Sequence, residues 1–471
     1  MSKIHVFNTL LGKKEEFIPR QGNAVKMYAC GPTVYDLSHL GHARMAIVWD
    51  VVQRYLRFAG YDVTYVRNIT DVDDKIIKRA RELGITPEKL SRQYTYKFWH
   101  DMQELNVESP DFEPRATEFI AQMIAFTQAL IDAGHAYQSE GDVYFDVASF
   151  KEYGKLGKQN LEQLLVGARD QAVAQESLAH LKKSPVDFAL WKSADVSELG
   201  WPSPWGYGRP GWHLECSAMV KRILGETIDI HAGGEDLVFP HHENEIAQSE
   251  ALHGQPMARY WLHNSFVQTN SEKMAKSLGN FKTIQDLLQT FSPDTIRLFI
   301  LQSHYRNPID FTIESLQGTS TGIQRLLRAA SFAISADEAE AEIPSAAAQA
   351  AAETFKQEFA EAMNNDFNTA IAISQLYQLA DGITQTSSLS DKHYLANTLL
   401  HYAKVLGLTM KDTRKDINNE VGSKLIDLIL TLRSEARARK DYASADLIRK
   451  TLTEIGVNVM DSPQGASWER V

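Results

Sequence analysis

Residues 25–69 read VKMYACGPTVYDLSHLGHARMAIVWDVVQRYLRFAGYDVTYVRNI. The segment begins with an apolar run that stops at Gly-Pro, as a buried strand does. It ends with YDVTYVRNI, whose apolar and polar residues alternate like those of a second strand. Between them, apolar residues recur at helical spacing up to Gly60: Val48, Val51, Val52 and Tyr55. The segment therefore predicts a β-α-β unit of a parallel sheet, with a right-handed crossover.

Chemically useful residues stand where both of these predicted strands end. Cys30 and Gly31 follow the first strand, and residues 68–71 (NITD) follow the second. Ligands of parallel sheets bind at the carboxyl ends of the strands. We therefore expect a binding site at this edge.

The rest of the chain divides into a mixed front half and a helical back half. Residues 75–200 are polar and predict mainly helix, and 201–216 (WPSPWGYGRPGWHLEC) predict an ordered loop rather than regular structure. Residues 226–237 predict a strand and a glycine turn that lead into a helix over 240–252.

The acidic, alanine-rich segment 333–348 predicts a linker. Everything after it predicts helix. Two apolar helix faces are expected there: Ile373, Leu376, Tyr377 and Ala380; Leu425, Leu428, Ile429 and Leu432.

The composition is that of a globular protein with about three or more domains. The chain has 471 residues, a formal net charge of −11 and only two cysteines, which exclude a disulfide scaffold. No apolar run approaches the ~18 residues of a membrane span, and no secretory signal is visible at the start. The negative net charge argues against a surface that is positive all over, as in some nucleic-acid-binding proteins. It is compatible with a local basic face.

The motif His39-Leu40-Gly41-His42 lies at the turn from the first strand into the helix. Helix N-termini attract phosphate, and imidazoles at i and i+3 share one face. The glycine lets a nucleotide base approach the backbone. Taken alone, four residues favour the simpler interpretation, a capped helix with two surface histidines.

A second candidate is Lys273-Met274-Ala275-Lys276-Ser277. Its two lysines could neutralise charge on a pyrophosphate leaving group. Lysine pairs are common, so the pattern alone favours a solvated loop.

The two cysteines suggest a metal site. His241 and Glu245 are i and i+4 on the predicted helix and point the same way, whereas His242 and Glu243 are expected to point elsewhere. Two thiolates, an imidazole and a carboxylate make a four-ligand zinc set. Spacing alone leaves open whether Cys30 reaches this helix, and free cysteines are usually small buried side chains.

Taken together, these motifs resemble the cysteinyl-tRNA synthetases, a family of class I aminoacyl-tRNA synthetases. The resemblance covers nearly the whole chain and includes, in one order, the segments YACGPTVYDLSHLGHAR (28–44), YVRNITDVDDKI (65–76), DFALWK (187–192), WPSPWGYGRPGWHLECSAM (201–219), GGEDLVFPHHENEIAQSE (233–250), EKMAKSLGNF (272–281) and NNDFNTA (364–370). Several motifs in one order are more specific than any one alone. The match therefore favours the functional interpretations over a capped helix with surface histidines, a solvated lysine loop and two buried cysteines.

The resemblance implies a Rossmann-like α/β parallel-sheet catalytic core with an insertion, then an all-α helical bundle and a small C-terminal domain. The implied domains are the first catalytic half (1–115), an inserted connective region (116–204), the second catalytic half (205–270), a lysine-loop and stem-contact region (271–330), the bundle (345–410) and an anticodon-binding module (411–471).

The resemblance also assigns roles. His39, Gly41 and His42 would bind ATP with Lys276, and His39, His42, Lys273 and Lys276 would be catalytic. Where the family has Lys-Met-Ser-Lys-Ser, this chain has Ala275, which removes one hydroxyl, a loss of roughly 1 kcal/mol. One zinc per chain would be held by Cys30, Cys216, His241 and Glu245. Cysteine would be contacted by Gly31, Thr70, Trp212, His231 and Asp236.

The implied reaction joins L-cysteine to tRNA(Cys) with ATP·Mg²⁺. The family suggests a monomer, and the absence of a visible signal or membrane span predicts a cytoplasmic protein without a membrane partner. Residues 433–450 hold six basic and three acidic residues, with Arg433, Arg437 and Lys440 on one helical stripe. This stripe is either a solvated face or part of the anticodon-reading module, where Trp468 could stack on a base.

Two other functions remain open from sequence. A related ligase could pass the activated cysteine to an amino sugar, but such enzymes lack the full tRNA-reading tail present at 411–471. A synthetase-like binding protein without catalysis would have broken ATP motifs, and here only Ala275 is altered.

Overall fold

A computed structural model describes residues 3–160, 181–269, 272–273, 282–335, 343–411, 414–454, 457–462 and 465–470. These residues form two compact units, Met1–Met410 and Lys411–Val471. Among them, no helix is both long and apolar enough to cross a bilayer.

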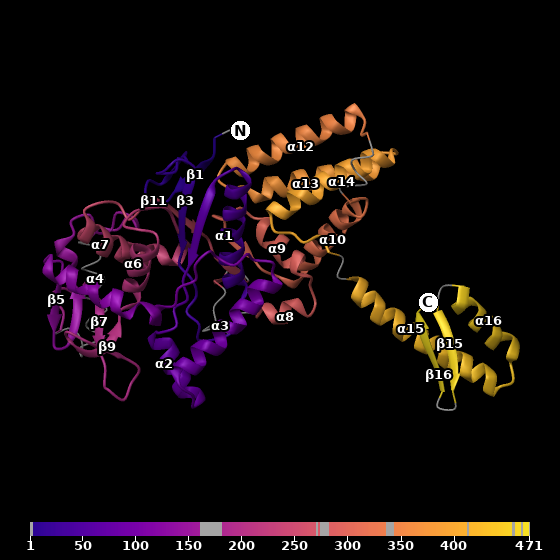
Figure 1. Cartoon of the computed structure of the whole chain (residues 1–471), viewed down its shortest axis with the longest axis horizontal. Helices are drawn as coiled ribbons and strands as arrows, with labels where there is room; N and C mark the ends of the chain where they lie inside the picture. The colour runs from indigo at the N-terminus through magenta and orange to yellow at the C-terminus, as the bar shows by residue number, and fades with distance from the viewer. Residues whose placement is uncertain are drawn as a thin grey trace. The chain divides into compact units, whose positions relative to one another are not determined.

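The first unit is built on a parallel sheet of four strands in the order β11-β10-β3-β4 (Figure 1). The strands are β3 (Ala24–Ala29), β4 (Asp62–Arg67), β10 (Ile228–Gly234) and β11 (Ala258–Asn264). Parallel bridges from Val66 to Phe112 and from Ile69 to Arg115 add an extended segment beside β4. The β-α-β unit predicted over 25–69 is confirmed, with α1 (Leu40–Phe58) as its helix.

The predicted apolar face of α1 lies against the helical region, because Val48, Val51 and Val52 line a small cavity together with Tyr305 and Phe367. Val48, Val51, Val52 and Tyr55 are all buried, as the helical spacing requires. At its start, the His39 ring accepts from the Gly41 N–H, and the His39 N–H donates to His42 Nδ1. This reciprocal cap satisfies two donors that a helix start otherwise leaves unpaired.

The insertion contains more strand than the sequence predicts. Helices α2 (Asp74–Leu83), α3 (Pro87–Glu104) and α4 (Ile120–Asp132) are followed by an antiparallel sheet in the order β5-β6-β7-β9-β8. Its strands are β5 (Ala136–Ser139), β6 (Asp142–Phe145), β7 (Phe188–Ser193), β8 (Trp201–Ser203) and β9 (Gly206–Pro210). The prediction of mainly helix over 75–200 is therefore wrong for residues 136–145 and 188–193, and residues 161–180 lie outside the described part of the chain. The reason is that strands of three to six residues are too short to give a clear period.

The prediction of an irregular loop over 201–216 is also wrong. Besides β8 and β9, the segment begins α6 (Trp212–Ile223), so Cys216 lies inside a helix. The predicted helix over 240–252 is α7 (Glu243–His253), and a π-helical turn over Val238–His242 precedes it. Phe239 is extended inside that turn, which changes the direction of the histidines after it.

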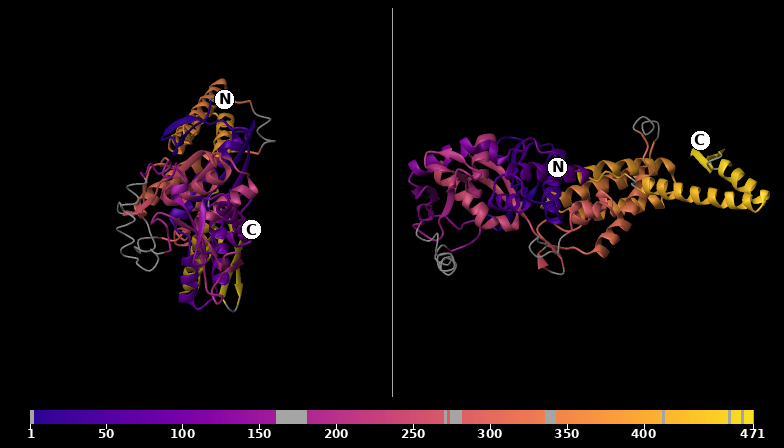
Figure 2. Two further views of the ribbon diagram at one scale, coloured as in Figure 1. Left: turned by 90° about the vertical axis from the view of Figure 1, so that its left-hand side faces the viewer. Right: turned by 90° about the horizontal axis from the view of Figure 1, so that it is seen from below.

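A helical bundle completes the first unit. Helices α8 (Ile284–Leu288), α9 (Pro293–Leu301) and α10 (Ile313–Ala330) precede α12 (Ala346–Asn364), α13 (Thr369–Gln385) and α14 (Leu389–Val405), and the last three lie side by side (Figures 1 and 2). The apolar face predicted for α13 is confirmed. Ile373, Leu376 and Ala380 are buried, and Tyr377 packs beside them and is partly buried. Of the predicted linker, residues 336–342 lie outside the described residues.

The second unit has helices α15 (Arg414–Ala438) and α16 (Tyr442–Glu454) and an antiparallel hairpin, β15 (Val457–Ser462) with β16 (Gly465–Arg470). The hairpin contradicts the expectation of helix to the end of the chain. The predicted α15 face is wrong as well, because Leu425, Leu428 and Leu432 are exposed. The small core of this unit is formed instead by Leu430, Leu452, Val457 and Val459.

Candidate functional site

Two thiols, an imidazole and a carboxylate meet at the carboxyl edge of the parallel sheet. Cys30 directly follows β3, and Cys216 comes from α6. His241 comes from the π-helical turn before α7 and Glu245 from the first turn of α7, so three segments far apart in sequence contribute. All four are buried, and their ligand atoms lie within 4.8 Å of one another. The structure thus brings together the four residues of the predicted metal set.

The distances within this cluster are short. Cys30 Sγ lies 3.7 Å from Cys216 Sγ and 3.5 Å from Glu245 Oε1. His241 Nε2 lies 3.7 Å from Cys216 Sγ and 2.7 Å from Glu245 Oε1.

These distances suit zinc. In a tetrahedral site with Zn–S bonds of about 2.3 Å, two sulfurs lie about 3.8 Å apart, and a sulfur lies about 3.6 Å from a nitrogen or oxygen ligand. The three distances that involve sulfur agree with these values within about 0.2 Å. Only the contact from His241 to Glu245 is shorter, because an imidazole and a carboxylate hydrogen bond directly. The donor set, its spacing and its burial therefore fit a zinc site with four protein ligands.

A second donor set overlaps the first. Cys30 and Glu245 also lie within reach of His231, on β10, and of His242. His242 Nε2 is 3.3 Å from Cys30 Sγ, and His231 Nε2 is 3.0 Å from Glu245 Oε2. The prediction that His242 points elsewhere is therefore wrong, because the π-helical turn rotates it into the cluster.

Glu243, in contrast, points away from the cluster, as predicted. Its carboxylate accepts from the backbone N–H groups of Gly154, Leu156 and Gly157. It thereby anchors the insertion to the start of α7.

Burial and mutual contact set the charges of the cluster. Burial raises the pKa of Cys30 well above its usual value, whereas the hydrogen bond with Cys30 lowers the pKa of Cys216 to about 6. Burial disfavours the charged form of His241, but Glu245 raises its pKa to about 10. Burial also opposes ionisation of Glu245, and His231 and His241 nevertheless hold its pKa well below the usual value. The cluster therefore holds protons that a bound cation would release.

A layer of histidines surrounds the four ligand residues. His213 Nδ1 lies 2.9 Å from His241 Nδ1, and His242 Nδ1 lies 2.8 Å from His263 Nε2. His263 in turn contacts Thr9 Oγ1 at 2.8 Å. Such partners orient ligand rings. Sequence reasoning missed His213 and His263, and no spacing pattern marks them.

An open cavity of about 520 Å³ lies beside the cluster. Its walls include predicted residues from the metal, ATP and amino-acid sets: Cys30, Gly31, His39, Gly41, His42, Trp212 and Asp236. The strand-to-helix turn and the thiol cluster therefore face the same cavity.

Trp212 connects the cavity to the cluster. Its ring stacks on His241, with centroids 4.2 Å apart and planes at 28°, while 36% of the residue stays exposed. His231 is fully buried and stacks on Trp261, with a centroid distance of 4.5 Å.

Thr70 is buried behind the cavity wall and does not line it. Its hydroxyl donates to Glu215 at 2.9 Å. Glu215 is a further buried carboxyl group that sequence reasoning missed, and burial raises its pKa well above the usual value.

Two predicted glycines are required by close contacts. A Cβ on Gly31 would lie 1.6 Å from the Asn68 carbonyl oxygen, and a Cβ on Gly41 would lie 2.8 Å from His39 Cε1. Only glycine therefore fits at Gly31 without moving the backbone of the next strand.

The lysine loop lies mostly outside the described residues. The backbone of Lys273 belongs to β13 (Glu272–Lys273), while Ala275 and Lys276 are among residues 274–281, which the structure does not describe.

The predicted basic stripe of the second unit does not form as expected. Arg433 is buried, Arg437 is exposed, and Lys440 lies beyond the end of α15 with a positive φ of 60°. Trp468 lies on β16, and its side chain is outside the described part.

The fold is shared with class I aminoacyl-tRNA synthetases. Methionyl-tRNA synthetase of Mycobacterium tuberculosis in complex with methionyl-adenylate superposes with a TM-score of 0.59 at 15% identity, over 87% of this chain and 94% of that chain. A LeuRS ternary complex of Agrobacterium radiobacter K84 superposes with a TM-score of 0.61 at 12% identity, over 83% and 84%.

Three family models match the sequence. Residues 16–321 match the catalytic domain of class I (C) tRNA synthetases, residues 358–411 match the DALR domain, and residues 424–468 match the cysteinyl-tRNA ligase anticodon binding domain. The fold and the site thus define a class I aminoacyl-tRNA synthetase.

Sequence relatives identify the family within this class. The chain is 46% identical to cysteine–tRNA ligases of Syntrophotalea carbinolica and Maridesulfovibrio salexigens, and 45% identical to that of Legionella pneumophila, each over 99% of both chains. The chain belongs to the cysteine–tRNA ligase family, as the sequence motifs predict.

Proposed function

We propose that this chain activates L-cysteine with ATP·Mg²⁺ and transfers it to the 3′ end of tRNA(Cys). The observation that carries the proposal is the position of the buried thiol cluster beside the cavity that His39, Gly41 and His42 also line. One cavity can therefore select a thiol and bind a nucleotide.

Cys30, Cys216, His241 and Glu245 hold the zinc in this proposal. When bound, zinc supplies a soft Lewis acid that prefers a thiolate to a hydroxyl group. Cysteine and serine have nearly the same shape, so a steric pocket separates them poorly. Such a site removes the need for a separate editing domain.

Gly31, Thr70, Trp212, His231 and Asp236 are proposed to hold the amino acid. The Asp236 carboxylate would pair with the α-ammonium group, because it stands in the cavity wall. Trp212 would close the side chain pocket over His241. Thr70 and the fully buried His231 would shape the pocket from behind.

His39, Gly41 and His42 are proposed to bind ATP at the start of α1, where backbone N–H groups and the helix dipole favour phosphate. Gly41 leaves the space that the base requires. Lys273 and Lys276 would neutralise charge on the pyrophosphate as it leaves.

The chemistry then needs no protein nucleophile. The carboxylate of cysteine attacks the α-phosphorus of ATP, and pyrophosphate departs with the bonding electrons. A ribose hydroxyl at the tRNA 3′ end attacks the resulting mixed anhydride, and AMP leaves. The residues named above act by positioning the reactants and stabilising charge.

The match of residues 424–468 to an anticodon binding domain supports tRNA, rather than an amino sugar, as the acceptor. We also propose that the chain acts as a monomer, the state that the family suggests, and that it acts in the cytoplasm.

The test is cysteine-dependent ATP–pyrophosphate exchange, with serine as the control amino acid, followed by charging of tRNA(Cys). We expect exchange with cysteine and not with serine, and charging of tRNA(Cys). Absence of exchange would overturn the proposal, and exchange without charging would favour the amino-sugar ligase.

A further inference from the structure

Arg44 is a buried cation in the wall of the candidate active-site cavity, and the proposal above gives it no role. It lies near the start of α1, two residues after His42, and only 1% of its surface is exposed. The same cavity wall contains His39, Gly41 and His42. Arginine is almost never buried so completely unless it is paired, so its contacts indicate what it does.

Among the described residues, the Arg44 guanidinium donates to three backbone carbonyl groups. Nη1 donates to the Phe266 carbonyl, and Nη2 donates to the carbonyls of Tyr305, at 3.0 Å, and Asn307. Phe266 directly precedes β12 (Val267–Thr269), and Asn307 lies two residues before β14 (Ile309–Asp310). One side chain of α1 therefore holds the starts of two strands.

These two strands form a small sheet with β13, the strand that contains Lys273. In the middle strand, β12, Gln268 pairs with Asp310 of β14 on one side and with Lys273 of β13 on the other. The backbone of Lys273 is thus linked to α1 through β12 and Arg44.

The chain on the other side of the lysine loop is also joined to the start of α1. The Ile284 N–H donates to the Ser38 carbonyl at 3.1 Å, and an antiparallel bridge joins Thr283 to His39. Both described flanks of residues 274–281 are therefore attached to the helix start that carries the predicted ATP residues.

The positive charge of Arg44 has no carboxylate partner in the described part of the chain. Arg44 forms no ion pair there, and its Nε atom is buried without a hydrogen-bond partner. Burial lowers the pKa of Arg44 to about 10, against the opposing effect of Glu235, so the group is charged at neutral pH. A buried cation without a counter-charge costs free energy, which a bound anion can offset.

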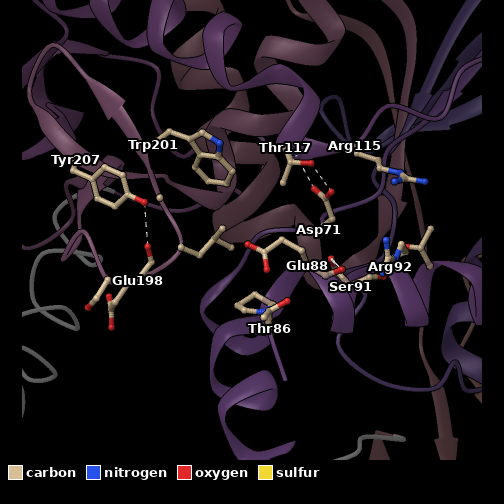
Figure 3. A pocket seen from close by; sticks show the side chains of 15 residues that line it. Asp71, Thr86, Glu88, Ser91, Arg92, Arg115, Thr117, Glu198, Trp201 and Tyr207 are labelled. Atoms are coloured by element: carbon tan, nitrogen blue, oxygen red, sulfur yellow. Dashed lines mark hydrogen bonds between the residues drawn. The ribbon is translucent and has the colours of Figure 1, made fainter. Parts of the chain in front are cut away.

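The charged side chains of two cavities indicate where such an anion fits. A larger cavity, of about 680 Å³, has three carboxylates and two arginines in its wall (Figure 3): Asp71, Glu88, Glu198, Arg92 and Arg115. Among the described lining residues of the candidate active-site cavity, Asp236 is the one carboxylate, whereas Arg44 and Lys75 are both cationic. The charge balance therefore favours a triphosphate in the cavity that Arg44 lines.

We propose that Arg44 is a positioning residue for the triphosphate of ATP. It holds β12 and β14, and through them the Lys273 backbone, against the helix start that contains His39 and His42. Its uncompensated charge favours the β- and γ-phosphates, which leave as pyrophosphate. This inference rests on the proposed function, because it assigns a further residue to the ATP of the first step.

The kinetic test is ATP–pyrophosphate exchange by the wild type, Arg44→Met and Arg44→Lys at varied ATP, pyrophosphate and cysteine. In Arg44→Met we expect kcat/KM for ATP and for pyrophosphate to fall about 10- to 100-fold, since a displacement of about 1 Å can cost 100-fold. Arg44→Lys keeps the charge but not the planar fork that reaches three carbonyls, so it should lose nearly as much. KM for cysteine and the zinc content should stay at their wild-type values.

A binding experiment separates the phosphates from the rest of the nucleotide. The probes are ATP and AMP, titrated by calorimetry without cysteine. We expect Kd for ATP to rise about tenfold in Arg44→Met, the size of one lost charged contact. AMP, which lacks the β- and γ-phosphates, should bind as it does to the wild type. Arg44→Lys gives the same comparison if the methionine variant does not fold.

The matched control is Arg297→Met. Arg297 is also a fully buried arginine, and it donates to the backbone carbonyls of Leu105, Asn106 and Leu406. It lines neither of the two cavities. At a temperature where all variants are folded, we expect its KM for ATP and its Kd for ATP to match those of the wild type.

Wild-type kcat/KM for ATP in both Arg44 variants, or equal weakening of ATP and AMP, would overturn the inference. The same rise of Kd for ATP in Arg297→Met would also overturn it, because loss of any buried arginine would then have this effect. A wild-type chain without exchange would instead overturn the proposed function, so the two failures are distinguishable.

Discussion

Cys30 and Cys216 are 186 positions apart in the chain, and their sulfur atoms lie 3.7 Å apart in the fold. The contact joins the end of β3 to the middle of α6 across the whole insertion. Both residues are buried and neither forms a disulfide. The thiol cluster can therefore form only when the chain after the insertion comes back to the sheet edge where Cys30 lies.

The first prediction concerns the metal. Cys30→Ser should lose the bound zinc, because Cys30 belongs to both overlapping donor sets. Cys216→Ser should also lose it, because we assign the ion to the set with Cys216 and His241. The measurement is metal content per chain after gel filtration.

His242→Gln is the matched control, since it removes a donor of the second set only. We expect it to keep one zinc per chain. A Cys216→Ser variant that keeps its zinc while His242→Gln loses it would show that the assignment is wrong and that the second set holds the ion.

The second prediction concerns Trp212, which stacks on His241 and stays partly exposed. Trp212→Ala should raise KM for cysteine about 2- to 10-fold, the range that corresponds to one aromatic contact. KM for ATP should change much less. ATP–pyrophosphate exchange at varied cysteine and ATP concentrations measures both KM values. Trp212→Phe should bring KM for cysteine most of the way back to the wild-type value. Equal effects on both KM values would contradict a specific role in the cysteine pocket.

The third prediction concerns the buried ion pair between Arg297 of α9 and Asp50 of α1. Arg297 also donates to the carbonyls of Leu406, at 2.6 Å, and Leu105, at 3.1 Å. Arg297→Met should lower the free energy of unfolding by about 3 kcal/mol, because among the described residues it leaves the buried Asp50 carboxylate with Arg54 as its one ionic partner. Urea denaturation of the first unit measures the change.

The matched control for this pair is Arg325→Met, which breaks a half-exposed pair with Asp381. Exposed ion pairs contribute about 0–1 kcal/mol to stability. The urea concentration at the unfolding midpoint of Arg325→Met should therefore stay close to that of the wild type. A similar decrease in the free energy of unfolding for Arg297→Met and Arg325→Met would contradict the prediction, because burial would then not determine how much an ion pair stabilises the fold.

The fourth prediction concerns pH. Burial lowers the pKa of His263 to about 3, whereas an unfolded histidine titrates near about 6.5. Between these values the unfolded chain binds a proton that the folded chain does not, so stability falls as pH falls through this window. The loss approaches about 1.4 kcal/mol per pH unit for this residue.

The measurement is melting temperature from pH 7 to pH 4 on protein treated with a chelator, which removes the contribution of metal release. His263→Gln should give a shallower dependence than the wild type. Parallel curves would show that His263 is protonated in the folded protein.

Local patterns predicted much of the fold and part of the site. The β-α-β unit was predictable because Val48, Val51, Val52 and Tyr55 repeat at helical spacing between two apolar runs. The His241 and Glu245 pair was predictable because i and i+4 residues share a helix face. The meeting of Cys30 with that pair was implied by the family resemblance and not by spacing.

The features that sequence missed depend on local backbone irregularity and on which of two apolar faces becomes buried. His242 enters the cluster because Phe239 is extended within a π-helical turn, and no periodicity reveals such a turn. The leucines of α15 were misassigned because a helix with apolar residues on two sides has two possible buried faces. The core there uses Leu430 instead.

The segment 333–348 separates two regions of the sequence, but these two regions share one hydrophobic core. One continuous apolar cluster contains side chains of α1 and of α12 and α13, and the Tyr55 hydroxyl donates to Asn364 Oδ1 at 2.8 Å. During synthesis, the N-terminal region cannot complete its native core until the helices up to Val405 have left the ribosome. A shortened chain that stops before residue 345 would carry this apolar surface in contact with water, and we expect it to aggregate.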